Sequence, residues 1–397
     1  MKVIELWPIV AMSMVTSPLL AQQVTPVVQL SPTVETKDLF SEPLGYGISV
    51  LPTTGGFFLQ EGGADPHSMD VIYKVTFAGV KTVALDLNKL SNTGKIPPHE
   101  YYLGDYTPDP RGGLLTNLVW LDPKTRYPHY SLMKVDEHGD PQSFFSLNED
   151  FIPSRVVSFY SGNYLLTGHS AGEPPSVLSM EILDSRGQVI VPNLKLPDGG
   201  PKVQSLKALP TADGGSLTHD LNTSDAKVPV EDLPFKGQEL PASGAFSFVV
   251  TSGDDNFVYA YSVQNPKAIH KISDGGKIEE IQLVKLPLQA EESAYPIEMC
   301  TAHGQVLLHW AIFPSSRPKD FPRESPWFIP LRHYWSVYSN FDGSIITTYV
   351  SEPGKRLAQP LPGSILVGYE PRNFYFLDQI RTPSGDWSFS LLHATPK

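Results

Sequence analysis

The feature that most constrains this 397-residue chain is a four-strand pattern between Ser154 and Pro197, which recurs along the sequence. Four short apolar or alternating runs are separated by turns containing Gly, Asn and Asp, and a Pro-rich loop over residues 169–176 joins the second run to the third. Gly adopts the positive φ that tight hairpin turns require. The stretch therefore predicts an antiparallel four-stranded sheet without a helix.

Five further copies match this stretch in pattern rather than in residue identity. The last copy supplies only three strands, whereas residues 25–30 form a strand-like segment with no partner of its own. We therefore predict an all-β fold, a six-bladed β-propeller of four-stranded antiparallel blades, closed by the N-terminal strand pairing with the last blade. Within a single domain of residues 22–397, the predicted blade cores are residues 46–87, 99–147, 155–196, 245–286, 296–350 and 365–394.

The composition favours short strands and turns over long helices, because the chain contains 38 Pro, 31 Gly and only 18% charged residues. In blade number and strand pattern the chain resembles the secreted bacterial six-bladed propellers of the NHL-repeat, TolB-like and gluconolactonase-like superfamily. This resemblance implies the fold and leaves function open. The repeated Gly-His and Trp-Asp pairs of WD40 blades are not found, and no residues can be matched to the gluconolactonase metal ligands.

The first 21 residues predict an export signal, because Lys2 precedes a mostly apolar run over residues 6–20 and the small residue Ala21 suits cleavage. We therefore expect a periplasmic or extracellular protein. An uncleaved membrane anchor is the alternative, although the apolar run is short for a spanning helix. No later stretch is expected to span a membrane. The single cysteine, Cys300, excludes an intrachain disulfide and is interpreted as a buried structural thiol.

The formal charge of −12, without a cluster of Lys and Arg, argues against nonspecific nucleic-acid binding. The eleven histidines show no metal-binding spacing, and His129, His309 and His333 can converge only through tertiary placement. We therefore expect no cofactor and no metal site. The expected state is a monomer whose partner is a protein, a peptide or a glycan.

The long insertions all fall on one face of the predicted ring. In a propeller, the loop between the second and third strands and the crossover to the next blade share a face, which we call the long-loop face. It carries the insertions 88–98, 198–244 and 314–333 and the shorter loops 61–70 and 169–176. Long ordered loops commonly bind or cover something, so this face is predicted to be the working surface. The alternative is neutral drift in exposed loops.

Aromatic and basic residues gather in and just after the last insertion. Such groups suit stacking and bidentate contacts with a carbohydrate, a peptide or an anion. In the alternative interpretation, the rings form a small core that anchors their own loop. The candidate ligand-binding residues are Trp327, Phe328, Arg332, Tyr334 and Trp335, together with His169 from a second loop on the same face.

The segment Gly168-His169-Ser170-Ala171-Gly172 matches the nucleophile elbow of α/β-hydrolases. An elbow must be followed by a helix, which Pro174 and Pro175 block, so no catalytic residue is predicted. The leading hypothesis is an exported, noncatalytic propeller that binds a protein, peptide or glycan through its long-loop face. The alternative is a lactonase- or hydrolase-type enzyme with a metal or carboxylate site at the mouth of the central channel.

Overall fold

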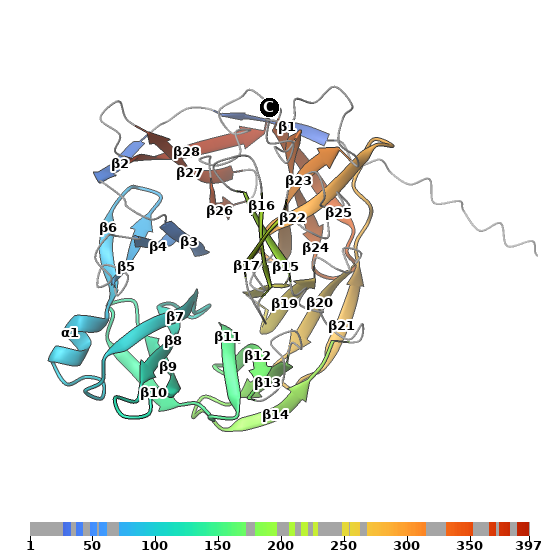
Figure 1. Ribbon diagram of the computed structural model, residues 1–397. Helices are drawn as coiled ribbons and strands as arrows, with labels where there is room; N and C mark the ends of the chain where they lie inside the picture. The colour runs from blue at the N-terminus through green and yellow to red at the C-terminus, as the bar shows by residue number, and fades with distance from the viewer. Residues whose placement is uncertain are drawn as a thin grey trace, which may run out of the picture.

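A computed structural model shows six antiparallel sheets arranged side by side around a common axis (Figure 1). The prediction of a six-bladed, almost entirely β propeller is confirmed. The structure describes residues 27–32, 37–42, 48–53, 55–61, 71–171, 179–196, 206–210, 216–220, 225–228, 248–253, 255–262, 268–314, 331–351, 365–370, 373–381 and 387–396.

In the first three blades, the strands follow one another from the axis outward in chain order. Blade 1 contains β3 (Ile48–Thr53), β4 (Gly56–Glu61), β5 (Val71–Thr76) and β6 (Lys81–Asp86); blade 2 contains β7 (Tyr101–Pro108), β8 (Leu114–Leu121), β9 (Pro128–Val135) and β10 (Pro141–Ser146); blade 3 contains β11 (Phe151–Ser158), β12 (Tyr164–Ser170), β13 (Ser179–Leu183) and β14 (Val189–Leu194).

The last three blades repeat this order, except that blade 6 takes its fourth strand from the N-terminal region. Blade 4 contains β18 (Phe248–Ser252), β19 (Phe257–Ser262), β20 (Ala268–Ser273) and β21 (Ile278–Gln282); blade 5 contains β22 (Glu292–Ala302), β23 (Gln305–Pro314), β24 (Arg332–Ser339) and β25 (Ile345–Ser351); blade 6 contains β26 (Ile365–Glu370), β27 (Asn373–Arg381) and β28 (Trp387–Pro396).

Two N-terminal strands pair with the last blade, which confirms the predicted closure. The strand β1 (Val27–Pro32) pairs with β28 and also, in parallel, with β25, so it joins blades 5 and 6. The strand β2 (Lys37–Glu42) forms the longer ladder with β28 and is the fourth strand of blade 6. Sequence reasoning assigned the closure to residues 25–30 alone. It passed over 37–42 because three of those six residues are charged, which lowers β-propensity.

Each junction between successive blades contains a hydrophobic core, so the described residues form six such cores around the ring. Both faces of the second strand of a blade are therefore buried over most of its length, as β8 and β12 show, whereas the inner strand β7 is partly exposed. Representative pairs across the six junctions are Ile72 and Met133, Leu115 and Leu166, Ile182 and Ile272, Ile269 and Leu308, Val337 and Phe376, and Val367 and Val75.

The inner strands are also linked by side-chain hydrogen bonds across the junctions. Asp105 on β7 accepts hydrogen bonds from Arg155 Nη1 and the Val156 amide on β11, both at 3.0 Å. Ser252 Oγ on β18 donates to the Ser158 carbonyl at 2.7 Å, and Thr301 Oγ1 on β22 donates to the Ser252 carbonyl. These bonds fix the position of each inner strand along the ring axis relative to the inner strand of the next blade.

Two of the predicted insertions contain regular structure that the sequence did not reveal. The helix α1 (Leu87–Asn92) lies within the crossover from blade 1 to blade 2, at the outer edge of the ring (Figure 1). It is too short to show a helical period. The strands β15 (Leu206–Pro210), β16 (Ser216–Asp220) and β17 (Asp225–Val228) form a three-stranded sheet in the 198–244 insertion. The Asp213-Gly214-Gly215 turn sequence was the available signal.

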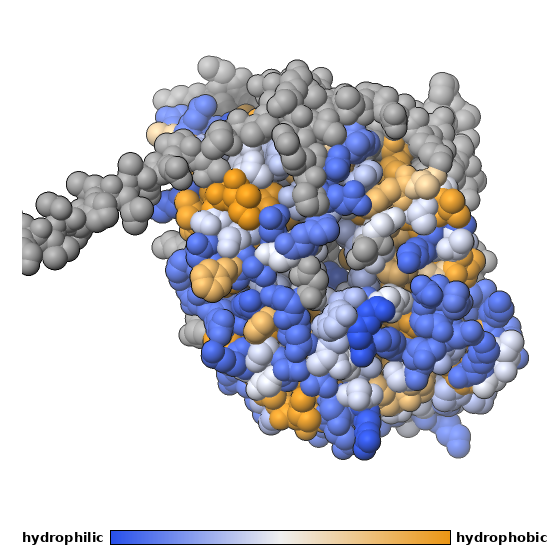
Figure 2. Space-filling view, turned by 180° about the vertical axis from the view of Figure 1, so that it is seen from behind, coloured by the Kyte–Doolittle hydropathy of each residue, from blue (hydrophilic) through white to orange (hydrophobic). Residues whose placement is uncertain are grey.

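The surface carries no dominant hydrophobic patch among the described residues that Figure 2 shows; this face is mostly hydrophilic, with hydrophobic groups in small separate patches. None of the described helices has the length and apolar character needed to cross a bilayer.

The junction cores predict a sharp contrast between two isoleucines. Ile272 is completely buried between blades 3 and 4, whereas Ile190 on the outer strand of blade 3 is 46% exposed. Ile272→Ala is expected to lower the free energy of unfolding by about 2–5 kcal/mol, because it leaves a cavity. Ile190→Ala should change it by less than about 0.5 kcal/mol. Urea unfolding measures both, and equal losses would contradict the proposed role of the junction cores.

Candidate functional site

Three aromatic rings stack face to face on blade 2. Trp120 lies between His99 and His129, with ring centroids 4.0 Å and 4.3 Å apart and planes inclined by only 5° and 15°. Tyr101 contacts His99 edge-on at 5.8 Å, and Tyr127 contacts His129 edge-on at 5.7 Å. We refer to His99, Trp120, His129 and Tyr127 as the ring stack.

The register of blade 2 brings these rings together. Tyr101 pairs with Trp120 across β7 and β8, and Trp120 pairs with His129 across β8 and β9. Directly paired residues project from the same face of a sheet, and His99 shares that face because it lies two residues before Tyr101. The stack stands at the end of the blade where the crossover and the β8–β9 loop lie, so it belongs to the long-loop face.

The insertion before β7 holds His99 in place. Asp86 caps the N-terminus of its helix α1, because the Asp86 side chain accepts a hydrogen bond from the Lys89 amide at 2.9 Å. Leu87, Leu90 and Ile96 then bury their side chains in the core between blades 1 and 2. The predicted insertion 88–98 is thus an ordered support for the first ring of the stack.

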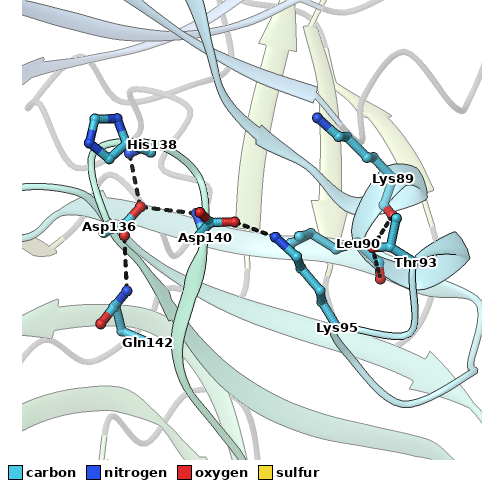
Figure 3. Close-up of polar contacts among 8 residues, drawn as sticks. All are labelled: Lys89, Leu90, Thr93, Lys95, Asp136, His138, Asp140 and Gln142. Carbon is cyan, nitrogen blue, oxygen red and sulfur yellow. Dashed lines mark hydrogen bonds and ion pairs between the residues drawn. The ribbon is translucent and has the colours of Figure 1, made fainter.

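A contact with the β9–β10 turn also holds this insertion, as Figure 3 shows. Lys95 forms an ion pair with Asp140 in this turn. Asp136 fixes the turn, because its carboxylate accepts hydrogen bonds from the amides of His138 and Asp140 and from Gln142 Nε2, at 2.9, 3.0 and 2.9 Å. These bonds, the Asp140 amide foremost, hold the pKa of Asp136 below its usual range. Since the Lys95 pair is half exposed, it orients the insertion more than it stabilises the fold.

Tyr127 is presented by a compact loop between β8 and β9. The Asp122 carboxylate accepts hydrogen bonds from the Thr125 and Lys124 amides at 2.7 and 2.8 Å, and these bonds lower its pKa. Arg126, with φ of 60°, closes the loop by donating its amide to the Asp122 carbonyl at 2.8 Å. Tyr127 is left 45% exposed beside His129.

One carboxylate contacts the ring stack. His129 Nδ1 lies 3.1 Å from Glu149 Oε1. Glu100 accepts a hydrogen bond from the Tyr102 hydroxyl at 3.0 Å, and Tyr102 projects from the face of β7 opposite to Tyr101, so Glu100 does not belong to the stack. His99 is exposed, and Glu149 is 64% exposed at its side chain. An exposed ring and a carboxylate acceptor are thus available together to a ligand on this face.

Three residues of the predicted aromatic and basic patch are described, namely Arg332, Tyr334 and Trp335, and they make contacts within the protein. Arg332 forms a bidentate ion pair with Glu292, with both nitrogen–oxygen distances 2.5 Å, and donates from Nε to the Tyr334 hydroxyl at 3.0 Å. The Arg332 hydrogen bonds, together with burial that acts in the opposite direction, leave the pKa of Glu292 below its usual range. The guanidinium is therefore occupied by an internal partner.

The aromatic residues of that patch lie on β24 and are buried. Trp335 is 1% exposed in the core between blades 5 and 6, and Tyr334 is 5% exposed between blades 4 and 5. Both rings therefore pack into the cores between blades. Trp327 and Phe328 lie outside the described residues, so their role stays a prediction. His169 is half-buried on β12, at a distance in the chain from both groups.

Two of the three histidines singled out in the sequence do converge. His309 Nε2 lies 2.9 Å from His333 Nδ1, both rings are buried, and both stack on Trp335. His129 belongs instead to the ring stack. Among the residues that the structure describes, no group of three or more His, Cys, Asp or Glu side chains is placed to hold a metal ion.

Sequence reasoning missed the ring stack, because its members come from three separate segments of blade 2. The available signal was the set His99, Trp120, Tyr127 and His129 at the predicted strand ends, on the face already assigned as the working surface. Strand register, rather than a local motif, places them in contact.

Comparisons with known proteins identify no family for this chain. No protein-family model and no curated protein matches the sequence. A protein of unknown function from Dyadobacter fermentans is 13% identical, with 94% of this chain and 98% of that one covered and a TM-score of 0.41. The fucose-specific lectin of Aleuria aurantia is 10% identical, with 89% of this chain and 98% of the lectin covered and a TM-score of 0.32. Prolyl oligopeptidase B of Galerina marginata is 11% identical, with 86% of this chain and 50% of that protein covered and a TM-score of 0.39. These similarities carry no argument about function.

The buried histidine pair predicts a pH-dependent loss of stability. Burial, with a further contribution from His309, lowers the pKa of His333 from 6.5 to about 3. Between these values the unfolded chain binds the proton more readily than the folded one, so stability must fall as the pH decreases from 6.5 toward 3. The His333→Gln variant should lose up to about 1.4 kcal/mol per pH unit of this slope. Urea unfolding at pH 7, 6, 5 and 4 measures the slopes; identical slopes in both proteins would contradict the assignment.

Proposed function

We propose that this chain is an exported, noncatalytic propeller that binds a glycan through the ring stack on its long-loop face. The observation that carries the proposal is the row of rings His99, Trp120, His129 and Tyr127, with the Glu149 carboxylate beside it. The fold supports binding in general, and the site argues for the class of ligand.

A sugar ring presents two kinds of surface that match this site. Its C–H faces are apolar and pack on aromatic rings, whereas its hydroxyls donate hydrogen bonds to carboxylates. The exposed rings of His99 and Tyr127 supply the first kind of contact, and Glu149 supplies the second. A nucleic acid or another polyanion is disfavoured, because the carboxylate and the net charge of −12 repel it.

The ring stack is held rigid before any ligand arrives. Each ring is fixed by its neighbours, and the loops that carry His99 and Tyr127 are closed by hydrogen bonds of Lys89, Asp122 and Arg126. Binding to such a surface loses little side-chain entropy, and this favours useful affinity from a small contact area.

Titration of the mature chain with an oligosaccharide panel tests the proposal. Tyr127→Ala and His99→Ala should each weaken binding about tenfold or more, since each removes a ring contact worth at least about 1.4 kcal/mol. Tyr160→Ala is the matched control, because Tyr160 is 52% exposed in the β11–β12 turn on the opposite face. If Tyr160→Ala loses affinity and the two variants do not, the ligand does not bind at the ring stack. If the chain binds peptides and no oligosaccharide, the ligand is a peptide and not a glycan.

Export is tested separately by expressing residues 1–397 in a bacterium with two membranes. The predicted signal gives a periplasmic protein whose first residue is Gln22, which N-terminal sequencing identifies. An intact N-terminus in the membrane fraction would instead support the anchor alternative.

A further inference from the structure

The turn between β7 and β8 presents an arginine on the face opposite the ring stack. Residues 109–112 of this turn read Asp-Pro-Arg-Gly. The Asp109 carboxylate accepts the Arg111 amide at 2.8 Å, and the Gly112 amide donates to the Asp109 carbonyl at 2.9 Å. Because β7 is the inner strand of its blade and faces the axis of the ring, the turn lies at the inner rim (Figure 1). Arg111 is exposed there.

A buried carboxylate orients this arginine. The Asp109 side chain is completely buried, and its two oxygens face two cations: Oδ1 lies 3.4 Å from Arg111 Nε, and Oδ2 lies 2.9 Å from Lys134 Nζ. Two charges of +1 against one of −1 leave a surplus of +1 in this group. Since the Lys134 side chain is only 14% exposed, the surplus is presented to solvent at Arg111.

The outer edge of the Arg111 guanidinium has no partner. Its Nε is directed to Asp109, whereas Nη1 and Nη2 form no hydrogen bond or ion pair within the described part of the chain. Asp136, in the neighbouring β9–β10 turn, already accepts three hydrogen bonds within its own hairpin. The two free nitrogens form a planar fork, which matches the two oxygens of a carboxylate.

The next blade supports the guanidinium. Gly162, in the β11–β12 turn, has a φ of 96°, and a Cβ there would come within 2.6 Å of Arg111 Nη1 and 3.1 Å of Nη2. A glycine is therefore needed at this position for both backbone and space. Gly162 covers the guanidinium from one side only, since the Arg111 side chain is still 35% exposed. A group that is held in this way loses little side-chain entropy when a ligand binds.

The same type of turn occurs in blade 3 without this arrangement. Residues 184–187 read Asp-Ser-Arg-Gly, the Asp184 carboxylate accepts the Arg186 amide at 2.8 Å, and the Gly187 amide donates to the Asp184 carbonyl at 3.0 Å. The Arg186 guanidinium nevertheless forms no ion pair with any described residue. Turn formation therefore explains the Asp and the Gly of the β7–β8 turn, and it does not explain the oriented guanidinium of Arg111.

We infer that Arg111 is an anion-binding residue, which takes a singly charged carboxylate through Nη1 and Nη2. The surplus of +1 balances one carboxylate, whereas a sulfate dianion exceeds it on a protein of net charge −12. A sugar acid and an acylated amino acid both supply such a group. Asp109, Lys134 and Gly162 position the guanidinium. This site is separate from the ring stack and does not depend on the proposed function.

Calorimetric titration of the protein with D-galacturonate and with N-acetylglycine tests the inference. At least one of these monocarboxylates should bind saturably, and the tighter of the two identifies the source of the carboxylate. N-acetylglycinamide, which lacks the charge, and sulfate should each bind at least tenfold more weakly. Failure of both monocarboxylates to bind, or tighter binding of sulfate, would overturn the inference.

Variants then locate the binding. Arg111→Lys keeps the charge and removes the planar fork, and Arg111→Gln removes both. Each should weaken the monocarboxylate at least tenfold, and Lys134 remains in both variants as the partner of the buried Asp109. The matched control is Arg186→Gln, which removes an arginine from the same type of turn and should leave the affinity unchanged. Equal weakening in Arg111→Gln and Arg186→Gln would show general attraction by positive charge, and no site at Arg111.

Two outcomes separate this site from the ring stack. Carboxylate binding that survives Tyr127→Ala but is lost in Arg111→Lys supports the inference, even where no oligosaccharide binds. Carboxylate binding that is lost in Tyr127→Ala and unchanged in Arg111→Lys belongs to the ring stack and overturns the inference.

Discussion

The packing of each blade against the next is the constraint on which the whole molecule depends. A four-stranded sheet with two apolar faces cannot stand alone in water, so each blade needs a neighbour on both sides. The six junction cores meet this need only when the ring is closed. Closure comes from β1 and β2, which tie the N-terminal region to β28. The first and last parts of the chain thus stabilise one another.

This architecture also determines where a site can form. The junction cores bury the middle of most strands, so ligand-binding side chains must lie at strand ends, in loops or at the inner edge of each blade. Blade 2 uses two of these places: the ring stack stands at its strand ends, and Arg111 lies in its β7–β8 turn. The same packing of the blades shifts the pKa values of two titratable residues, Asp105 and His333. Burial raises the pKa of Asp105 to about 6 against the opposing effect of Arg155, and burial lowers that of His333.

The repeated pattern was enough to predict the propeller, because strand length, turn residues and apolar runs are local properties of the chain. The strand β2 was not predicted, because its charged residues Lys37, Asp38 and Glu42 are typical of a loop. Only its pairing with β28 shows that it is a strand. The site was harder to predict. The sequence suggested that Trp335 and Tyr334 contact a ligand, yet both side chains are buried in the cores between blades. His99, Trp120 and His129 carry no motif, and they meet only because the register of blade 2 aligns them.

A crystal structure of the protein soaked with an oligosaccharide from the panel tests the central claim most directly. The account predicts a sugar ring packed on His99 or Tyr127 at the long-loop end of blade 2, with a hydroxyl within hydrogen-bond distance of Glu149. A glycan bound only on the opposite face, among the short hairpin turns near Tyr160, would contradict it.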